Sequence, residues 1–154
     1  MELKNEYFRS LLLGFTDCFL IFEQQSIEIM AEKILVVEDD VNIKQVVIFK
    51  LKNSGYEVST CGNGLEALEF LKTHTVDMII TDVMMPMMTG KELMVELKKN
   101  PETKDIPAVM LTSRTLEKEI VEGLSLGAED YIKKPFSPNE LLARVKMVLA
   151  RKKS

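Results

Sequence analysis

Short apolar runs alternate with longer stretches of helical apolar periodicity from residue 33 to the end of the chain. The run Ile34–Val37 is apolar throughout and rich in β-branched residues, which is typical of a parallel strand buried on both faces. Comparable runs recur along the sequence, and the predicted strands are 34–37, 56–61, 76–81, 108–111 and 131–132. Strands that alternate with helices indicate an α/β fold, because parallel neighbours need a crossover connection.

Each predicted strand is followed by a helical pattern with its own start or end signal. Asn63 stands three residues before Glu66, and Thr89 with Glu92 has the pattern of a capping box. Gly55 is placed to end the first helix. The five predicted helices run from about residue 43 to 54, from 63 to 71, from 89 to 100, from 116 to 126 and from 137 onward. We therefore predict a doubly wound sheet of five parallel strands with five helices.

Residues 1–30 do not follow this alternation. We predict a leader helix over 1–30 and one α/β domain over 31–154, a length that suits a single core. Met30 is a second methionine at which translation of the chain could begin. The leader is therefore either a native helix that mediates association or an upstream extension that is not native.

Composition excludes several classes of function. The net charge is −4, and residues 1–30 hold two basic and five acidic side chains, so the rest carries only about −1. A nearly neutral domain lacks the basic face that nucleic acids require, and we expect no direct nucleic-acid binding. Cys18 and Cys61 form no metal-ligand spacing, and two thiols do not make a disulfide framework, which favours a reducing cytoplasm. No apolar run approaches the ~20 residues that span a bilayer, so we expect no membrane partner.

Polar residues follow the predicted strands at the positions where open α/β sheets build their sites. Glu38 and Asp39 come after the first strand, and Asp82 comes after the third. Thr112 follows the fourth strand and Lys134 follows the fifth. Because the carboxyl ends of parallel strands meet at one edge, we expect these side chains to converge.

Such a group has a defined chemistry. Carboxylates ~4 Å apart repel by about 4 kcal/mol at an effective dielectric constant near 20, so the cluster must take up a proton or a cation. Oxygen ligands favour Mg²⁺. A carboxylate beside Mg²⁺ can attack phosphorus, while a lysine neutralises the phosphoryl oxygens and a hydroxyl donates to them. The sequence therefore predicts magnesium-dependent phosphoryl transfer.

Four motifs carry a resemblance to a known family. They are ILVVEDD at 34–40, DVMMP at 82–86 with Gly90, LTS at 111–113 and GAEDYIKKPF at 127–136. With these motifs, residues 32–152 resemble the receiver domain of two-component response regulators. The resemblance implies a flavodoxin-like sheet with the strand order 2-1-3-4-5.

The resemblance also implies roles for single residues. Asp82 matches the phospho-acceptor, and Glu38 with Asp39 matches the acidic pair that binds Mg²⁺. The main-chain carbonyl of Met84 matches the third protein ligand of the metal. We prefer the pair Glu38–Asp39 to Asp39–Asp40, since the family's basic helix residue then falls on Lys44.

Three further residues match the phosphate-sensing part of the family. Thr112 and Lys134 match the hydroxyl and the lysine that contact the phosphoryl group. Tyr131 matches the aromatic switch residue, which turns inward as the threonine moves. Pro135 matches a proline that follows a cis peptide bond.

The resemblance implies a signalling switch that accepts its phosphoryl group from a histidine kinase, and not an enzyme beyond its own phosphorylation and dephosphorylation. The chain ends soon after the last predicted helix, so we expect a stand-alone receiver that contacts a protein target. The surface of the fourth helix, fifth strand and fifth helix is the family's face for homodimers. A second interpretation stays open, in which the chain is a relay intermediate that passes the group to a histidine phosphotransfer protein. A phosphatase with an aspartate nucleophile is disfavoured, because Met84 stands where its acid would be.

Overall fold

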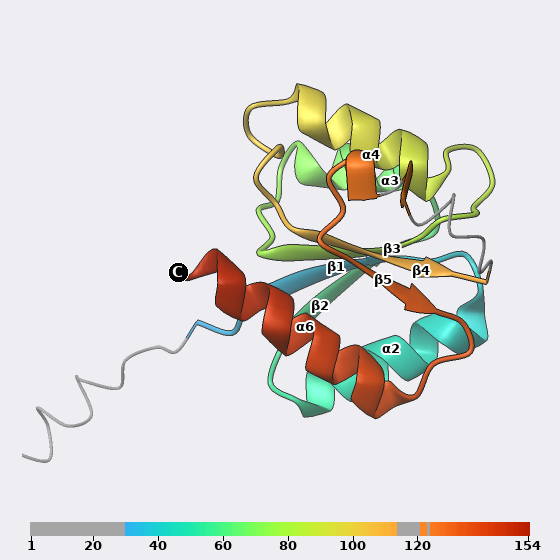
Figure 1. Cartoon of the computed structure of the whole chain (residues 1–154), viewed down its shortest axis with the longest axis vertical. Coiled ribbons are helices and arrows are strands. Elements are labelled where there is room, and N and C mark those ends of the chain that lie inside the picture. Colours follow the sequence, from blue (N-terminus) through green and yellow to red (C-terminus); the bar gives the residue numbers. More distant parts are fainter. Residues whose placement is uncertain (1–29, 114–120, 123) are drawn as a thin grey trace, which may run out of the picture. The chain divides into compact units, whose positions relative to one another are not determined.

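The strands of the computed structural model form one parallel sheet, and the structure describes residues 30–113, 121–122 and 124–154. The strand order is β2-β1-β3-β4-β5, which confirms the predicted order (Figure 1). The strands are β1 (Lys33–Val37), β2 (Glu57–Cys61), β3 (Met78–Asp82), β4 (Ala108–Thr112) and β5 (Asp130–Lys133). β3 begins two residues later than predicted. There the carboxylate of Asp77, in place of a backbone carbonyl, accepts the N–H of Lys33 at 2.8 Å.

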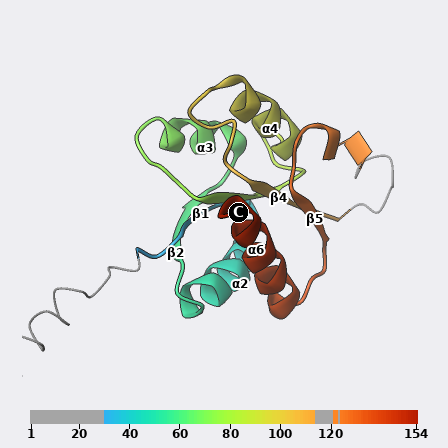
Figure 2. The same cartoon turned by 60° about the vertical axis from the view of Figure 1, so that its left-hand side comes forward.

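Helices cover both faces of the sheet. α2 (Val41–Asn53) and α6 (Pro138–Lys152) lie on one face, and α3 (Gly64–Leu71) and α4 (Gly90–Lys99) lie on the other (Figures 1 and 2). Successive residues of a strand point to opposite faces, so β1 must be apolar throughout to fill both interfaces. The core beneath α3 and α4 includes Leu35, Val37, Ile79, Leu93, Leu97 and Met110. The core beneath α2 and α6 includes Ile34, Val36, Val47, Leu51, Ile80 and Val145.

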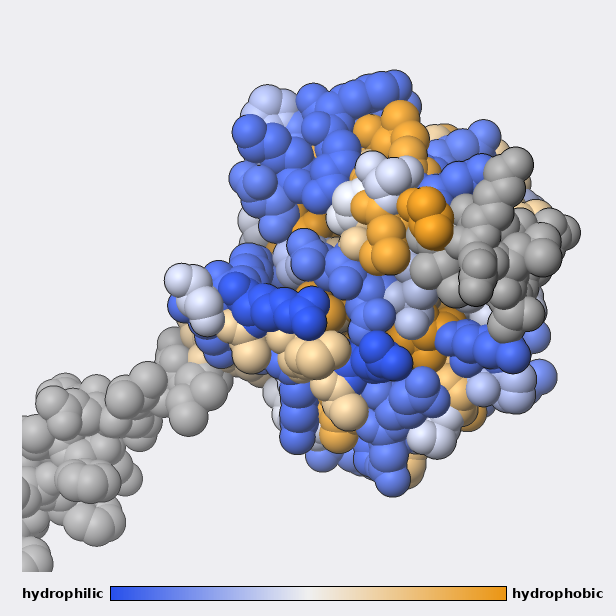
Figure 3. All heavy atoms as spheres, viewed as in Figure 1, coloured by the Kyte–Doolittle hydropathy of each residue, from blue (hydrophilic) through white to orange (hydrophobic). Residues whose placement is uncertain are grey.

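The predicted start signals of two helices are confirmed. Asn63 accepts the N–H of Glu66, and Thr89 forms a reciprocal capping box with Glu92. The face shown in Figure 3 is mostly hydrophilic with smaller apolar areas, and α2 exposes the side chains of Val41, Val46 and Phe49.

Two predicted helices fall wholly or mostly outside the described residues. The leader helix over 1–30 lies outside them apart from Met30, and most of the predicted fourth helix over 116–126 does too. Residues 121–122 and 124–125 are helical. Within the described part of the chain, four helices with defined bounds therefore stand against the five and the leader that were predicted.

The register of the sheet aligns the carboxyl ends of its central strands. Val37 of β1 pairs with Thr81 of β3, and Thr112 of β4 pairs with Lys133 of β5. Asp82 is the last residue of β3. The residues that follow β1 and β5 therefore leave the sheet at the edge where β3 presents its aspartate.

Candidate functional site

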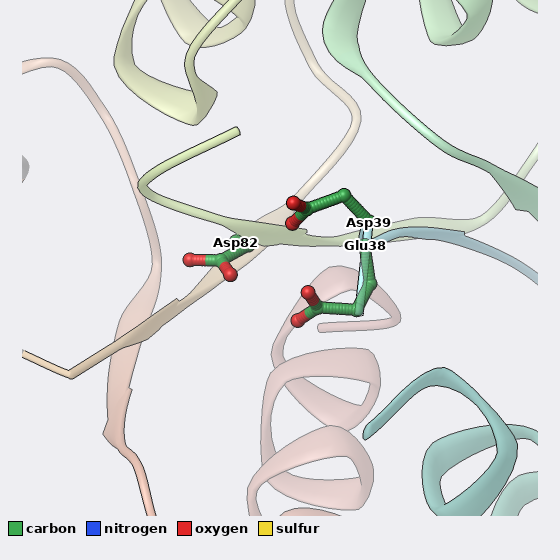
Figure 4. Close-up of side chains that lie close together, drawn as sticks. All are labelled: Glu38, Asp39 and Asp82. Carbon is green, nitrogen blue, oxygen red and sulfur yellow. The ribbon is translucent and has the colours of Figure 1, made fainter. Parts of the chain in front are cut away.

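Three carboxylates converge at the carboxyl edge of the sheet. The side chains of Glu38, Asp39 and Asp82 lie close together (Figure 4), and one oxygen of each lies within 4.8 Å of the other two. Glu38 is fully buried, Asp82 is 6% exposed, and Asp39 is exposed. The structure thus brings together the three acidic residues that the sequence predicted as metal ligands.

Lys134 bridges two of these acids. Its Nζ lies 2.9 Å from Oε2 of Glu38 and 2.5 Å from Oδ2 of Asp82, and its side chain is only 13% exposed. The backbone N–H of Lys134 donates to the carbonyl of Thr112 at 2.7 Å, which keeps the segment after β5 beside β4. The peptide bond between Lys134 and Pro135 is cis, as the resemblance implied.

The environment shifts the pKa values of both members of the buried Lys134–Glu38 pair. Burial raises the pKa of the Glu38 carboxyl above its ordinary value, although hydrogen bonds from Lys134 and from the N–H of Asp40 oppose this. Burial works to lower the pKa of Lys134, but hydrogen bonds to Asp82 and Glu38 outweigh it and raise that pKa. The lysine therefore stays charged, and the buried acid gives up its proton less readily than an ordinary glutamate.

Asp40 has a different task from its two acidic neighbours. Its carboxylate accepts the backbone N–H groups of Asn42 and Ile43 at 2.8 and 3.0 Å and so caps the start of α2. An aspartate at this position stabilises a helix both by capping and through the helix dipole. The Asp40 carboxylate is thus engaged at the start of α2, whereas those of Glu38 and Asp39 lie close to Asp82.

Backbone contacts on both sides hold Asp82 in place. The N–H of Met84 donates to Oδ1 of Asp82 at 3.1 Å. A Cβ built on Gly90 would collide with the carbonyl oxygen of Asp82, and the N–H of Gly90 donates to the carbonyl of Val83 at 3.0 Å. Only glycine allows α4 to begin this close to the aspartate.

Thr112 and Tyr131 lie on neighbouring strands, and the strand of Thr112 also pairs with the strand of Asp82. Thr112 ends β4 and is 5% exposed. Tyr131 is half-buried in β5, and its hydroxyl donates to the sulfur of Met110 at 3.0 Å. Met110 was not among the site residues predicted from the sequence. Its position two residues before Thr112 was the available signal, because residues i and i+2 of a strand share a face.

The donor set fits a hard divalent cation. Three carboxylates face one ammonium group, so the group keeps a negative excess in a largely buried place. Clustered carboxylate oxygens with access to solvent on one side suit Mg²⁺, which keeps several of its waters. The acidic group of Glu38, Asp39 and Asp82 could therefore hold Mg²⁺.

No helix within the described residues has the length and apolar character needed to span a bilayer.

The fold and the acidic site together define a class of protein, the five-stranded flavodoxin-like domains with a cluster of carboxylates at the carboxyl edge of the sheet. Residues 34–146 match the family model of the response regulator receiver domain, and the chain belongs to this family, which serves two-component phosphorelay signalling.

Individual relatives agree with this assignment. The probable transcriptional regulator ycf27 of Cyanidium caldarium is 46% identical over 118 residues, which are 77% of this chain and 46% of that protein. The chemotaxis response regulator CheY4 of Vibrio cholerae is 38% identical, with a TM-score of 0.74 over 77% of this chain and 99% of that one. The chain spans about half the length of the curated relatives it matches.

A third relative was solved with a metal. The receiver domain of the sensor histidine kinase PA1611 from Pseudomonas aeruginosa PAO1 is 26% identical, with a TM-score of 0.72 over 78% of this chain and 98% of that one. Its structure has a magnesium ion coordinated in the active site cleft.

Proposed function

We propose that this chain is a signalling switch that accepts a phosphoryl group on Asp82 in the presence of Mg²⁺. The observation that carries the proposal is the placement of the Asp82 carboxylate between an acidic pair and a buried lysine, 2.5 Å from Lys134 Nζ. The magnesium ion coordinated in the relative from Pseudomonas aeruginosa supports the choice of metal.

The residues divide the chemistry among them. An oxygen of Asp82 attacks phosphorus, the bond between phosphorus and a histidine nitrogen of the donor breaks, and that nitrogen keeps the electron pair. Glu38, Asp39, Asp82 and the carbonyl of Met84 would hold Mg²⁺, which when bound neutralises charge on the transferred group. Lys134 is placed to neutralise another phosphoryl oxygen.

After transfer, the hydroxyl of Thr112 donates to the phosphoryl group. Tyr131 on the next strand follows this movement and changes the surface around β5. The chain itself catalyses only its own phosphorylation and dephosphorylation. Its output is therefore a change of shape that another molecule recognises.

The phosphoryl donor in this proposal is a histidine kinase in the cytoplasm. The output is a contact with a downstream protein target and not with nucleic acid, although relatives about twice as long are named transcriptional regulators. A homodimer through the predicted fourth helix, β5 and α6 is part of the proposal. On that surface Arg144 of α6 pairs with Asp130 of β5 at 3.0 Å.

Labelling with acetyl phosphate and Mg²⁺ tests the acceptor. Wild-type protein should gain one phosphoryl group that hydroxylamine releases, and Asp82→Asn should gain none. Asp40→Asn is the matched control, because asparagine also caps helices and Asp40 serves the start of α2. Undiminished labelling of Asp82→Asn would refute the assignment of Asp82 as the phospho-acceptor.

A second experiment separates a terminal regulator from a relay intermediate. Purified phosphorylated protein is mixed with a histidine phosphotransfer protein, and the label is followed on both chains. Retention on this chain supports the terminal switch. Rapid transfer to the partner's histidine supports the relay.

A further inference from the structure

The thioether of Met110 lies between the proposed switch tyrosine and the backbone of the proposed phospho-acceptor. Met110 pairs with Thr81 of β3 on one side and with Tyr131 of β5 on the other. It is fully buried and belongs to the core beneath α3 and α4, against which Tyr131 packs.

The first contact of Met110 is polar. The Tyr131 hydroxyl donates to its sulfur at 3.0 Å. A thioether is a weak acceptor, but it is polarizable and makes favourable contacts with aromatic rings. A hydroxyl that enters an apolar core loses free energy unless it finds an acceptor, so this sulfur favours the inward position of the ring.

The methyl end of Met110 lies beside Gly90, at the point where Gly90 approaches the main chain of Asp82. A Cβ built on Gly90 would meet both the carbonyl oxygen of Asp82 and, at 3.1 Å, the terminal methyl carbon of Met110. The methyl group, the start of α4 and the main chain of Asp82 therefore share one tightly packed space. A shift of the Asp82 backbone or of α4 changes the room available to Met110, because packed interiors transmit small displacements.

We propose that Met110 is a positioning residue that holds Tyr131 inward and couples its ring to the backbone of Asp82. This inference rests on the proposed function and concerns the regulation of the same site. The route differs from the one through Thr112, because it needs no contact between the phosphoryl group and a hydroxyl. Thr112 and Met110 stand two residues apart on β4 and so act on the same face of the sheet.

Fluorine NMR of protein grown with 3-fluorotyrosine reads the position of the ring. The chain has three tyrosines, and Tyr131→Phe identifies the signal of interest. Met110→Leu keeps the volume but removes the sulfur that accepts from the Tyr131 hydroxyl. The Tyr131 signal should move toward its position in unfolded protein, with the inward population reduced roughly two- to tenfold, as expected for one lost hydrogen bond. Its response to beryllium fluoride, a phosphoryl mimic, should shrink as well.

Met78→Leu is the matched control. Met78 is equally buried in β3 but belongs to the core on the opposite face. It should leave the Tyr131 signal unchanged. Mg²⁺ affinity and acetyl phosphate labelling should stay within about twofold of wild type in Met110→Leu, because the metal ligands are untouched. A Tyr131 signal that does not move in Met110→Leu overturns the inference.

A double-mutant cycle supplies the second measurement. Unfolding in urea is compared for Met110→Leu, Tyr131→Phe and the double variant, and two residues in contact should give effects that do not add. Additive effects overturn the inference. If Met110→Leu does not fold, Met110→Ile takes its place in both experiments. Absence of wild-type labelling at Asp82 would instead refute the proposed function, so the two failures are distinguishable.

Discussion

The ammonium group of Lys134 lies 2.5 Å from Oδ2 of Asp82, and both side chains are largely removed from solvent. The same nitrogen lies 2.9 Å from Oε2 of Glu38. A protein cation therefore already neutralises part of the group that would bind Mg²⁺. Lysine and metal share the same oxygens, so each should weaken the hold of the other.

Lys134→Ala should bind Mg²⁺ more tightly than wild type. Removal of a unit charge a few ångströms away is worth more than 1 kcal/mol at an effective dielectric constant of ~20, which corresponds to roughly tenfold in the dissociation constant. The phosphorylated variant should nevertheless fail to switch, because a cation that contacts the phosphoryl group is missing.

Titration of Mg²⁺ into wild type and Lys134→Ala measures the change in Mg²⁺ affinity. The fluorine NMR signal of Tyr131, followed as beryllium fluoride is added, measures the loss of switching. Lys133→Ala is the control, since Lys133 is the adjacent residue and is exposed. An unchanged or weaker Mg²⁺ affinity in Lys134→Ala would contradict the prediction.

Mild acidification should have opposite effects on folding and on metal binding. The pKa of Glu38 is raised by burial above the ordinary value of 4.5, so the folded chain holds this proton more tightly than the unfolded chain does. As pH rises from 4.5 through the raised pKa, the contribution of Glu38 to the free energy of unfolding therefore falls. Mg²⁺ binding shows the reverse trend, because the metal needs the ionised carboxylate.

Urea unfolding without metal and Mg²⁺ titration, each between neutral pH and 4.5, measure the two trends. Subtraction of the Glu38→Gln profile isolates this group from carboxylates such as Glu92, whose pKa is lowered by hydrogen bonds with Thr89. Identical pH profiles for wild type and Glu38→Gln would refute the prediction.

Gly90→Ala should destabilise the domain and impair phosphorylation. The new methyl group would collide with the carbonyl oxygen of Asp82, which is main chain and cannot rotate away. Overpacking of this kind costs about 1–3 kcal/mol. Urea unfolding measures the loss, and acetyl phosphate labelling shows whether the acceptor is displaced.

Gly62→Ala provides the comparison for this change. Its Cβ would first meet the flexible side chain of Glu66 at 3.4 Å, an ordinary contact distance. We expect a change of less than about 1 kcal/mol there. Equal losses at the two glycines would show that the contact with Asp82 is not the cause.

A chain of residues 31–154 should fold and accept phosphate like the full chain. All strands and helices with defined bounds, and every residue assigned to the site, lie within this range. Thermal unfolding and Mg²⁺-dependent labelling of the shortened protein measure this. A large fall in melting temperature, or loss of Mg²⁺ binding, would make residues 1–30 part of the domain.

The sequence by itself determined the element order, the capping residues and the edge at which the site forms. Apolar runs buried on both faces mark parallel strands, and caps such as Thr89 with Glu92 are local pairs. Parallel strands then bring their carboxyl ends to one edge whatever the details of packing. The sequence was therefore sufficient to predict that Glu38, Asp82 and Lys134 lie at the same edge of the sheet.

Only the tertiary structure decided which polar groups contact each other. It turns Asp40 to the start of α2, leaves Glu38 fully buried, and joins Lys134 to two acids at once. It also placed the sulfur of Met110 within 3.0 Å of the Tyr131 hydroxyl. These contacts join residues far apart in sequence, and they depend on strand register and on the space left by neighbouring side chains. Local sequence signals report neither quantity, so the chemistry of the edge was predictable while its hydrogen bonds were not.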